Sequence, residues 1–516
     1  MAGQSLIERV INKAKEIAND EDIYVLTDSE EIRLISRRKG VLYFFKKSLK
    51  LSPGTIIENL IDFLVTVADD YQTFILLSPY VPLLAAKEIQ NALRKYESNQ
   101  EKFLVSVKKT FSRALTENRK NAYEILRGET EQKILIESLA FQIIDSSLVK
   151  NGKLRVDVRA GTYALSSDLI EIQSFQDWWV CEKLLKRKRI VFRVIGGEQV
   201  GMGHIQRTLT LAHEITDHEI RFVCDTKSKM AADKLAGYDY WLGIYKPEEI
   251  EDQIIALEPD LVINDMLNTT PEYINKLRSN KIPVVNFEDL GGGAALTNLT
   301  INELYDEPLI IGENILWGRE YFFIREEFND AQPIQLKEKV DSLLLIFGGT
   351  DPGDYVRKVL PLVKDECVNK DIKIYVVTGG GYPFIKELEK EIKKIGNSKI
   401  EYHHSIGVVS PIMEKVQIAI SSNGRTAYEL AHMNIPSIIL SHHKREKTHK
   451  FTKEENGFIP IGIFEGKETE EKVIAAFQRL TQDRDYRKTL FDRIKPFQFT
   501  QNKARVINLI FSVLNG

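Results

Sequence analysis

Short apolar runs alternate with longer amphipathic stretches along most of this chain. Runs of about four to seven apolar residues suit buried strands, and the stretches between them carry apolar residues at helical spacing. This alternation is typical of βαβ units, which build parallel sheets covered by helices. The pattern therefore predicts an α/β protein.

The first block of this pattern runs to about Leu185 and ends in the basic cluster Lys183–Arg189. A new buried strand, Ile190–Ile195, follows the cluster directly. We therefore predict a first domain over residues 1–186. Its expected elements are strands at Ile23–Thr27 and Thr73–Leu77 and helices near Thr55–Ala68 and Ala86–Tyr96.

The pattern then restarts twice, at Ile190 and at Ser342, each time with a strand that leads into a glycine-rich turn. Two successive doubly wound units predict two Rossmann-like lobes, residues 187–335 and 336–516, with a cleft between them. Ligands of such sheets bind beyond the carboxyl ends of the strands. The other expected elements are a helix at Ile205–Ile215, strands at Ile220–Cys224, Asp260–Asn264, Ile282–Asn286, Ile372–Val377, Ile400–His403, Gln417–Ser421 and Ser437–Leu440, and closing helices near Glu470–Gln482 and Gln501–Leu514.

Composition narrows the classes of protein that fit. A chain of 516 residues is too long for one hydrophobic core. The formal net charge of -3 gives no reason to expect nucleic acid as a partner, and no apolar run is long enough to span a membrane. The three cysteines lack CxxC spacing, so we expect a cytoplasmic protein without a disulfide framework.

The first glycine-rich turn, Gly201-Met202-Gly203-His204, lies between a buried strand and an amphipathic helix. Glycines there allow the backbone to approach a ligand, and the helix N-terminus offers free N–H groups to an anion. His204 stands at the mouth of the turn, where it can act as a general base. A structural histidine at the start of a helix fits equally well. We group Gly201, Gly203 and Arg207 as substrate-binding candidates.

The second lobe repeats this arrangement at Gly349-Thr350 and again at Ser422-Asn423. Ser422 or Asn423 can cap the following helix and leave N–H groups to hold a diphosphate. Glu429 falls about two turns along that helix, where its carboxylate can accept both ribose hydroxyls. A solvated helix glutamate is the alternative.

Four motifs carry a family resemblance: GMGHIQRTLTLA, ILWGREYFFIREEF, LLLIFGGTDPGD and ISSNGRTAYELAHMNIPSIIL. With them, the segment from Arg189 to about Gly462 resembles the UDP-sugar hydrolases of pseudaminic acid biosynthesis. That family removes UDP from 2,4-diacetamido-2,4,6-trideoxy-altrose and is built like the GT-B transferase that makes lipid II. The resemblance implies a GT-B fold and a UDP-sugar substrate.

The same resemblance implies roles for single residues. His204 would activate water for attack at the anomeric carbon, with UDP as the leaving group. The phosphates would rest on Gly349–Thr350 and Ser422–Asn423, and Glu429 would hold the ribose. No metal or cofactor is implied, because helix termini and backbone donors can stabilise a departing diphosphate.

This sequence departs from the family at two places. Asn264-Asp265-Met266 replaces the family's Asp-His-Tyr, so we take Asp265 as the nearest polar candidate for a catalytic role. The loop Ser441–His449 replaces an Asn-Gln pair near the sugar. Its histidines lack the spacing of a zinc site, and we expect His443 to face phosphate or sugar. Glu288 and Asp289 follow a strand and either bind sugar hydroxyls or solvate a turn.

The first block resembles the CMP-sialic acid synthetase family, or N-acylneuraminate cytidylyltransferases, through SLIERVINKAKE, IYVLTDSEEI, LLSPYVPLL and IQSFQDWWVCEKLL. In that family an opening strand and a CTP-binding loop come before the position of Ser5, and we expect this chain to lack both. Gln173 replaces the first metal-binding aspartate of the closing motif, although Asp177 remains. We interpret the block as a degenerate, inactive domain, and a truncated active enzyme is the alternative. Family members are commonly dimers, so we expect a homodimer through this domain.

Three functions fit these observations. We favour a nucleotide-sugar hydrolase that cleaves UDP from a deoxyamino sugar in nonulosonic acid or surface glycan biosynthesis. A GT-B glycosyltransferase is the first alternative, in which His204 deprotonates a hydroxyl of a glycan or protein acceptor. A non-catalytic nucleotide-sugar-binding scaffold is the second.

Overall fold

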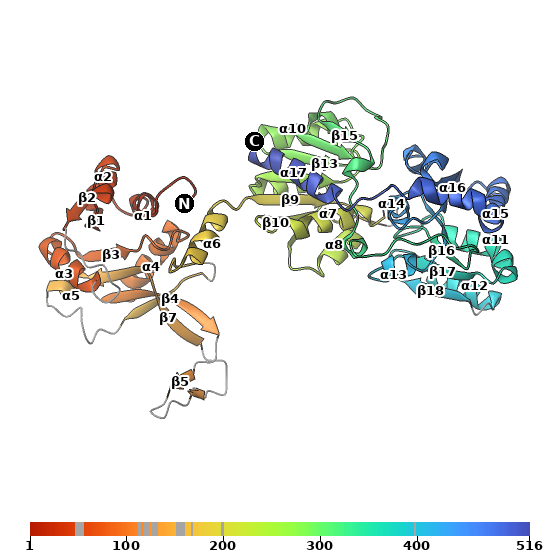
Figure 1. The fold of residues 1–516 in the computed structure, drawn as a ribbon. Coiled ribbons are helices and arrows are strands. Elements are labelled where there is room, and N and C mark those ends of the chain that lie inside the picture. The colour runs from red at the N-terminus through yellow and green to blue at the C-terminus, as the bar shows by residue number, and fades with distance from the viewer. Residues whose placement is uncertain are drawn as a thin grey trace. The chain divides into compact units, whose positions relative to one another are not determined.

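The computed structural model describes residues 1–46, 56–111, 115–117, 123–125, 133–150, 160–166, 169–197, 201–396 and 399–516. The chain divides into two compact units, Met1–Arg187 and Lys188–Gly516. The division lies next to the expected end of the first domain at residue 186. Each unit has its own sheets and its own core (Figure 1).

The first unit is built on a mixed sheet with the strand order β3-β7-β4-β8. Both β3 (Thr73–Leu77) and β4 (Phe103–Phe111) run antiparallel to β7 (Lys133–Asp145), while β8 (Gly161–Ala164) runs parallel to β4. The expectation of parallel strands almost throughout is therefore wrong for this unit. Apolar runs separated by polar segments do not by themselves distinguish the two kinds of pairing.

Smaller elements surround this sheet. A parallel pair joins β1 (Tyr24–Thr27) to β2 (Leu42–Phe45), and a short antiparallel pair joins β5 (Leu115–Glu117) to β6 (Tyr123–Ile125). The helices are α1 (Leu6–Lys15), α2 (Glu30–Arg38), α3 (Ile56–Val67), α4 (Ala86–Ser98), α5 (Ser146–Lys150) and α6 (Phe175–Leu185).

The second unit contains two lobes, each with one parallel sheet. The first sheet has the order β11-β10-β9-β12-β13-β14-β15. Its strands are β9 (Arg189–Val194), β10 (Glu219–Asp225), β11 (Trp241–Tyr245), β12 (Leu261–Asp265), β13 (Val284–Phe287), β14 (Leu299–Asn302) and β15 (Ile315–Trp317). Its helices are α7 (Gly203–Glu214), α8 (Lys229–Leu235), α9 (Ile250–Ala256) and α10 (Pro271–Ser279).

The second sheet has the order β18-β17-β16-β19-β20-β21. Its strands are β16 (Ser342–Ile346), β17 (Lys373–Thr378), β18 (Ile400–His404), β19 (Ile418–Ser422), β20 (Ser437–Ser441) and β21 (Phe458–Ile463). Its helices are α11 (Tyr355–Asn369), α12 (Ile385–Ile395), α13 (Ser410–Met413), α14 (Arg425–His432), α15 (Lys467–Gln482) and α16 (Arg484–Ile494).

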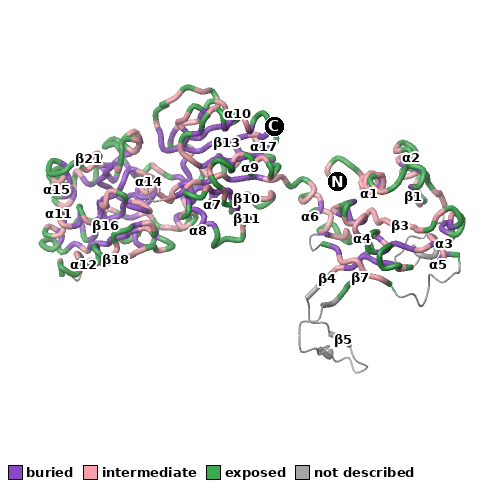
Figure 2. The backbone as a smooth tube through the Cα atoms, turned by 180° about the vertical axis from the view of Figure 1, so that it is seen from behind, coloured by how far each residue is buried: buried purple, intermediate pink, exposed green. Residues whose placement is uncertain are grey.

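Burial explains the sequence pattern of the central strands. Every residue of β12 and β19 is buried, as expected for strands of a parallel sheet that helices cover on both faces. In the second unit, Figure 2 shows buried residues along the strands and exposed residues along the outer helices. Continuous apolar runs therefore predicted these strands well.

The last helix, α17 (Asn502–Asn515), packs on the first lobe although it follows the second lobe in sequence. Its buried residues Val506, Ile510 and Leu514 join the core that contains Ile190 of β9. Lys188 Nζ also donates to the carbonyl oxygen of Leu514 at 2.6 Å. By packing, this part of residues 336–516 belongs with the first lobe.

The strand order of each lobe reverses at one place. In the first lobe β9 lies between β10 and β12, and in the second lobe β16 lies between β17 and β19. Ligands of doubly wound sheets bind at such switch points, beyond the carboxyl ends of the strands. Among the described residues, no helix combines the length and apolar character needed to cross a bilayer.

Candidate active site

A cleft of about 690 Å³ lies within the second unit, between its two lobes. Both glycine-rich turns border it. A Cβ on Gly349 would lie 3.2 Å from Cβ of Met202, so the two turns approach each other closely. The cleft is lined by the predicted residues Gly201, Gly203, His204, Glu288, Gly349, Thr350, Ser422, Glu429 and His443.

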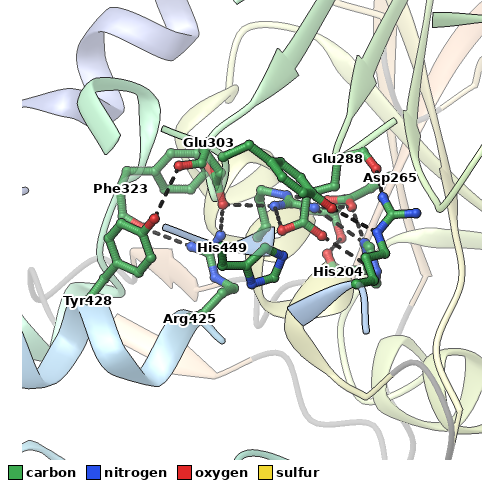
Figure 3. Close-up of polar contacts among 12 residues, drawn as sticks. His204, Asp265, Glu288, Glu303, Phe323, Arg425, Tyr428 and His449 are labelled. Carbon is green, nitrogen blue, oxygen red and sulfur yellow. Dashed lines mark hydrogen bonds and ion pairs between the residues drawn. The ribbon is translucent and has the colours of Figure 1, made fainter. Parts of the chain in front are cut away.

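His204 and Asp265 meet at the switch point of the first lobe (Figure 3). His204 lies in the first turn of α7, and Asp265 is the last residue of β12. Nδ1 of His204 is 2.5 Å from Oδ1 of Asp265. Asp265 is fully buried, whereas His204 also lines the cleft. The Asp265 carboxylate, which does not line the cleft, therefore orients the His204 ring through Nδ1.

Three buried carboxylates converge on the guanidinium of Arg207, which is 1% exposed. Its Nε donates to Oδ2 of Asp265 at 2.7 Å, and its Nη1 donates to Oε1 of Glu303 at 2.7 Å. The same Nη1 lies 3.2 Å from Oε1 of Glu288. Burial alone would raise the pKa of Asp265 and of Glu288, but the interactions with Arg207 and His204 together outweigh burial and hold both pKa values below their usual range. Both carboxylates are therefore ionised.

Glu288 faces the cleft directly after β13. Its backbone has a φ of 52°, in the left-handed region that favours glycine. Its Oε2 lies 3.8 Å from Nε2 of His204. A non-glycine residue in this conformation persists only where its surroundings hold it, and such residues cluster at functional sites.

Across the cleft, the N-terminus of α14 is open to a ligand. Gly424 is the N-cap residue, and no side chain caps the helix. Ser422, Gly424 and Thr426 line the cleft here. Unpaired N–H groups and the positive end of a helix dipole attract an anion.

The N-terminus of α11 is different because its own chain fills it. Asp351 Oδ1 accepts from the backbone N–H of Tyr355 at 2.8 Å, and Oδ2 accepts from that of Val356 at 2.9 Å. Burial raises the pKa of Asp351 to about 6, against the two N–H donors that lower it. The turn at Gly349–Thr350 thus borders the cleft, but its helix offers these donors to Asp351.

Glu429, the predicted ribose ligand, lines the cleft and pairs with an arginine. Nε of Arg325 donates to Oε1 of Glu429 at 2.7 Å, and Nη1 of Arg325 lies 2.5 Å from Oε1 of Glu327. Arg325, from the segment between the lobes, thus fixes the orientation of the Glu429 carboxylate through one of its oxygens.

Two other predicted residues lie behind the cleft surface. Asp289 accepts from the backbone N–H of Thr269 at 2.9 Å and of Gly291 at 2.8 Å, so it ties together the loops that follow β12 and β13. Asn423 donates to the carbonyl oxygen of Glu446 at 2.7 Å. Like the buried Arg207, neither side chain lines the cleft, because other groups of the protein already engage it. Their contacts with substrate stay predictions.

Two histidines of the histidine-rich loop pack against other parts of the second lobe. The ring of His442 stacks on Tyr355 with centroids 4.4 Å apart, and burial lowers the pKa of His442 to about 4. Nδ1 of His449 is 2.7 Å from the carbonyl oxygen of Asn423. Within the part of the chain that the structure describes, no three His, Cys, Asp or Glu side chains form a group that could hold a metal ion.

Three residues of the site were not singled out from the sequence. Glu303 follows β14, a strand that was not predicted. Arg425 lies in the quoted motif SSNGRTAYE without an assigned role, and Arg445 lies in the histidine-rich loop. Arg425 and Arg445 both reach partners in the first lobe. No local pattern could have identified partners so far apart in sequence.

The first unit matches a known protein family. A family model described as cytidylyltransferase matches residues 1–177. The first unit is a cytidylyltransferase-like domain. In this domain Asp177, the remaining candidate for a metal-binding carboxylate, belongs to a capping box at the start of α6. Its Oδ2 accepts from the backbone N–H of Ser174 at 2.8 Å and of Gln173 at 3.0 Å.

Three curated relatives are similar to this chain. An uncharacterized protein of Methanocaldococcus jannaschii is 26% identical over 264 residues, which cover 48% of this chain and 54% of the relative. The chain thus spans about half the length of that protein. The spore coat polysaccharide biosynthesis protein SpsG of Bacillus subtilis is 24% identical, over 52% of this chain and 82% of the relative. The UDP-2,4-diacetamido-2,4,6-trideoxy-beta-L-altropyranose hydrolase of Campylobacter jejuni is 24% identical, over 42% of this chain and 78% of the relative.

Among solved structures, MurG of Acinetobacter baumannii aligns with a TM-score of 0.47 and 11% identity, covering 63% of this chain and 99% of that one.

Proposed function

We propose that residues 188–516 form a GT-B-type hydrolase that cleaves UDP from a deoxyamino sugar, in nonulosonic acid or surface glycan biosynthesis. The observation that carries this proposal is the position of His204. Its Nδ1 is held by Asp265, and its ring lines the same cleft as the open N-terminus of α14. A general base and an anion site thus border one space.

In this reaction, His204, one water molecule and the N–H groups at the start of α14 account for every bond that forms or breaks. Nε2 of His204 takes a proton from water as the water oxygen bonds to the anomeric carbon. The bond from this carbon to the β-phosphate oxygen breaks, and UDP leaves with the electron pair. Attack from the side opposite UDP inverts the configuration. The N–H groups at the start of α14 stabilise the departing charge, and His204 then releases its proton to solvent.

Asp265 serves this step by holding the imidazole in one tautomer. Because the pKa of Asp265 is lowered, the carboxylate accepts a hydrogen bond, so Nδ1 of His204 carries the proton and Nε2 presents its lone pair. The imidazolium that forms is then paired with Asp265. We expect the Glu429 carboxylate to accept hydrogen bonds from the ribose hydroxyls. The names of two relatives support a sugar nucleotide as substrate and a glycan pathway.

We also propose that the cytidylyltransferase-like domain transfers no nucleotide and makes the chain a homodimer. The capping role of Asp177 supports the loss of activity. Phe175 and Trp179, one turn apart on α6, are 79% and 64% exposed and offer an apolar contact. Analytical ultracentrifugation should give a dimer for the wild type and a monomer for Trp179→Glu. An unchanged dimer would place the contact elsewhere.

The decisive experiment measures UDP release from UDP-2,4-diacetamido-2,4,6-trideoxy-beta-L-altropyranose without an acceptor. We expect turnover by the wild type and a loss of about 10²- to 10⁴-fold in His204→Ala, the usual range for removal of a general base. His213→Ala is the matched control, because His213 is an exposed histidine of the same helix. It should keep full activity.

The other outcomes separate the alternatives. UDP release only after a glycan or protein acceptor is added would establish a glycosyltransferase in which His204 deprotonates that acceptor. Binding of the sugar nucleotide without turnover, with or without acceptors, would establish a non-catalytic scaffold.

A further inference from the structure

Both glutamates beside Arg207 are held by arginines of the other lobe. Glu303 pairs with Arg207 from its own lobe and with Arg425 from the second lobe. Glu288 lies beside Arg207, and its backbone oxygen accepts from Nη2 of Arg445 at 2.6 Å. The lobe that carries the predicted diphosphate site thus makes two contacts with the predicted catalytic cluster. This cluster consists of His204, Arg207, Asp265, Glu288 and Glu303.

The side chain of Arg445 makes three hydrogen bonds, all to residues of the first lobe. Besides the bond to Glu288, Nη1 donates to Oδ1 of Asn268 at 2.8 Å and Nε donates to the hydroxyl of Tyr305 at 2.7 Å. A planar guanidinium can satisfy three acceptors in fixed directions at once. The guanidinium of Arg445 therefore fixes the directions of its three hydrogen bonds, which the ammonium group of a lysine could not do.

Two of the three residues that Arg445 contacts have an uncommon backbone conformation. Asn268 and Glu288 have φ values of 51° and 52°, and they lie in the loops that follow β12 and β13. Thr269 and Asp289 bond these two loops together. Left-handed backbone at non-glycine residues requires such support from the surroundings. Arg445 supplies part of it from across the cleft.

We infer that Arg445 is a positioning residue that fixes Glu288, and the loops around it, beside His204 when the two lobes are closed. This inference rests on the proposed function. The Glu288 carboxylate lies 3.8 Å from Nε2 of His204, so a shift of its loop changes the surroundings of the base and of the attacking water. The catalytic cluster is thereby complete only when the second lobe is in place.

The test compares Arg445→Ala, Arg445→Lys and Lys444→Ala. Lys444 is exposed in the same loop and carries the same charge, so it is the matched control. We expect Arg445→Ala to lower kcat by about 10- to 100-fold, because small misplacements at an active site have effects of this size. KM and the Kd for UDP should change by less than about threefold. Arg445→Lys should recover only part of kcat, and Lys444→Ala should match the wild type.

A second readout needs no turnover. Amide hydrogen exchange, measured in the presence of UDP, should rise in peptides covering residues 266–270 and 287–293 of Arg445→Ala, and should not rise in Lys444→Ala. Unchanged exchange in these peptides would overturn the inference, whatever the activity. A raised KM with unchanged kcat would also overturn it, since Arg445 would then bind substrate directly. If the wild type does not cleave the UDP-sugar while exchange rises as expected, the proposed function fails and the positioning role stands.

Discussion

Nδ1 of His204 lies 2.5 Å from Oδ1 of Asp265, although the two residues are 61 positions apart in sequence. The contact forms because α7 begins, and β12 ends, at the same switch point of the first lobe. The carboxylate is buried and bonded to Arg207, so it is held rigidly. An imidazole supported in this way presents a defined nitrogen to the cleft.

The first prediction concerns that support. Asp265→Asn replaces an acceptor-only carboxylate with an amide, which can donate to Nδ1 and leave the proton on Nε2. We expect kcat to fall by about 10²- to 10⁴-fold, since the wrong tautomer cannot accept a proton from water. The Kd for UDP, measured by calorimetry, should stay within about threefold of the wild type, because Asp265 does not line the cleft. Full activity in this variant would remove Asp265 from the mechanism.

The second prediction concerns the stability of the buried charges. Glu303 is fully buried and pairs with both Arg207 and Arg425. Glu303→Ala leaves these guanidiniums without their shared carboxylate, so we expect the free energy of unfolding to fall by about 3–5 kcal/mol. Urea denaturation followed by tryptophan fluorescence measures this change.

Two further variants test the electrostatic origin of that loss. Glu303→Gln keeps a hydrogen-bond acceptor and should lose less stability than Glu303→Ala. Glu320→Ala removes an exposed glutamate and should cost less than about 0.5 kcal/mol. Equal losses in the alanine variants at 303 and 320 would contradict the role given to the buried pair.

The third prediction tests the anion site at α14. A Cβ on Gly424 would meet no atom within 4 Å, so a side chain fits there. Gly424→Asp should fill the N-terminus of α14 as Asp351 fills that of α11 and lower the affinity for UDP by about 10- to 100-fold, because the donors are taken and like charges repel. Gly424→Asn provides the same cap without the charge and should weaken binding less. Unchanged affinity in Gly424→Asp would move the diphosphate away from this helix.

The fourth prediction concerns Asp351 and pH. Burial raises its pKa from 3.8 to about 6, so the folded state binds this proton more tightly than the unfolded state. Stability is therefore lost as pH rises from about 4 to about 6, and the full cost above pH 6 is about 3 kcal/mol. Asp351→Asn keeps an acceptor for α11 and has no proton to lose. Its stability relative to the wild type should increase between about pH 4 and pH 7, measured by urea denaturation at each pH. A difference that does not vary with pH would contradict the raised pKa.

The sequence by itself determined the strands and turns that position the site. The predicted strand at Thr73–Leu77 matches β3, and the strand predicted to start at Ser342 matches β16, which begins at that residue. Apolar runs specify such strands because each depends on a short stretch of chain. His204 was predicted at the cleft from the glycine-rich turn before it, since turn chemistry is also local.

The tertiary structure alone decided which side chains complete the site. Glu303 and Arg425 are 122 residues apart, and Arg445 and Glu288 are 157 residues apart, so no periodicity or spacing links them. The folded chain also decided which helix N-terminus is free, because Asp351 fills that of α11 while Gly424 leaves that of α14 open. A pattern along the chain reports local preference, whereas a buried charge finds its partner through the packing of distant elements.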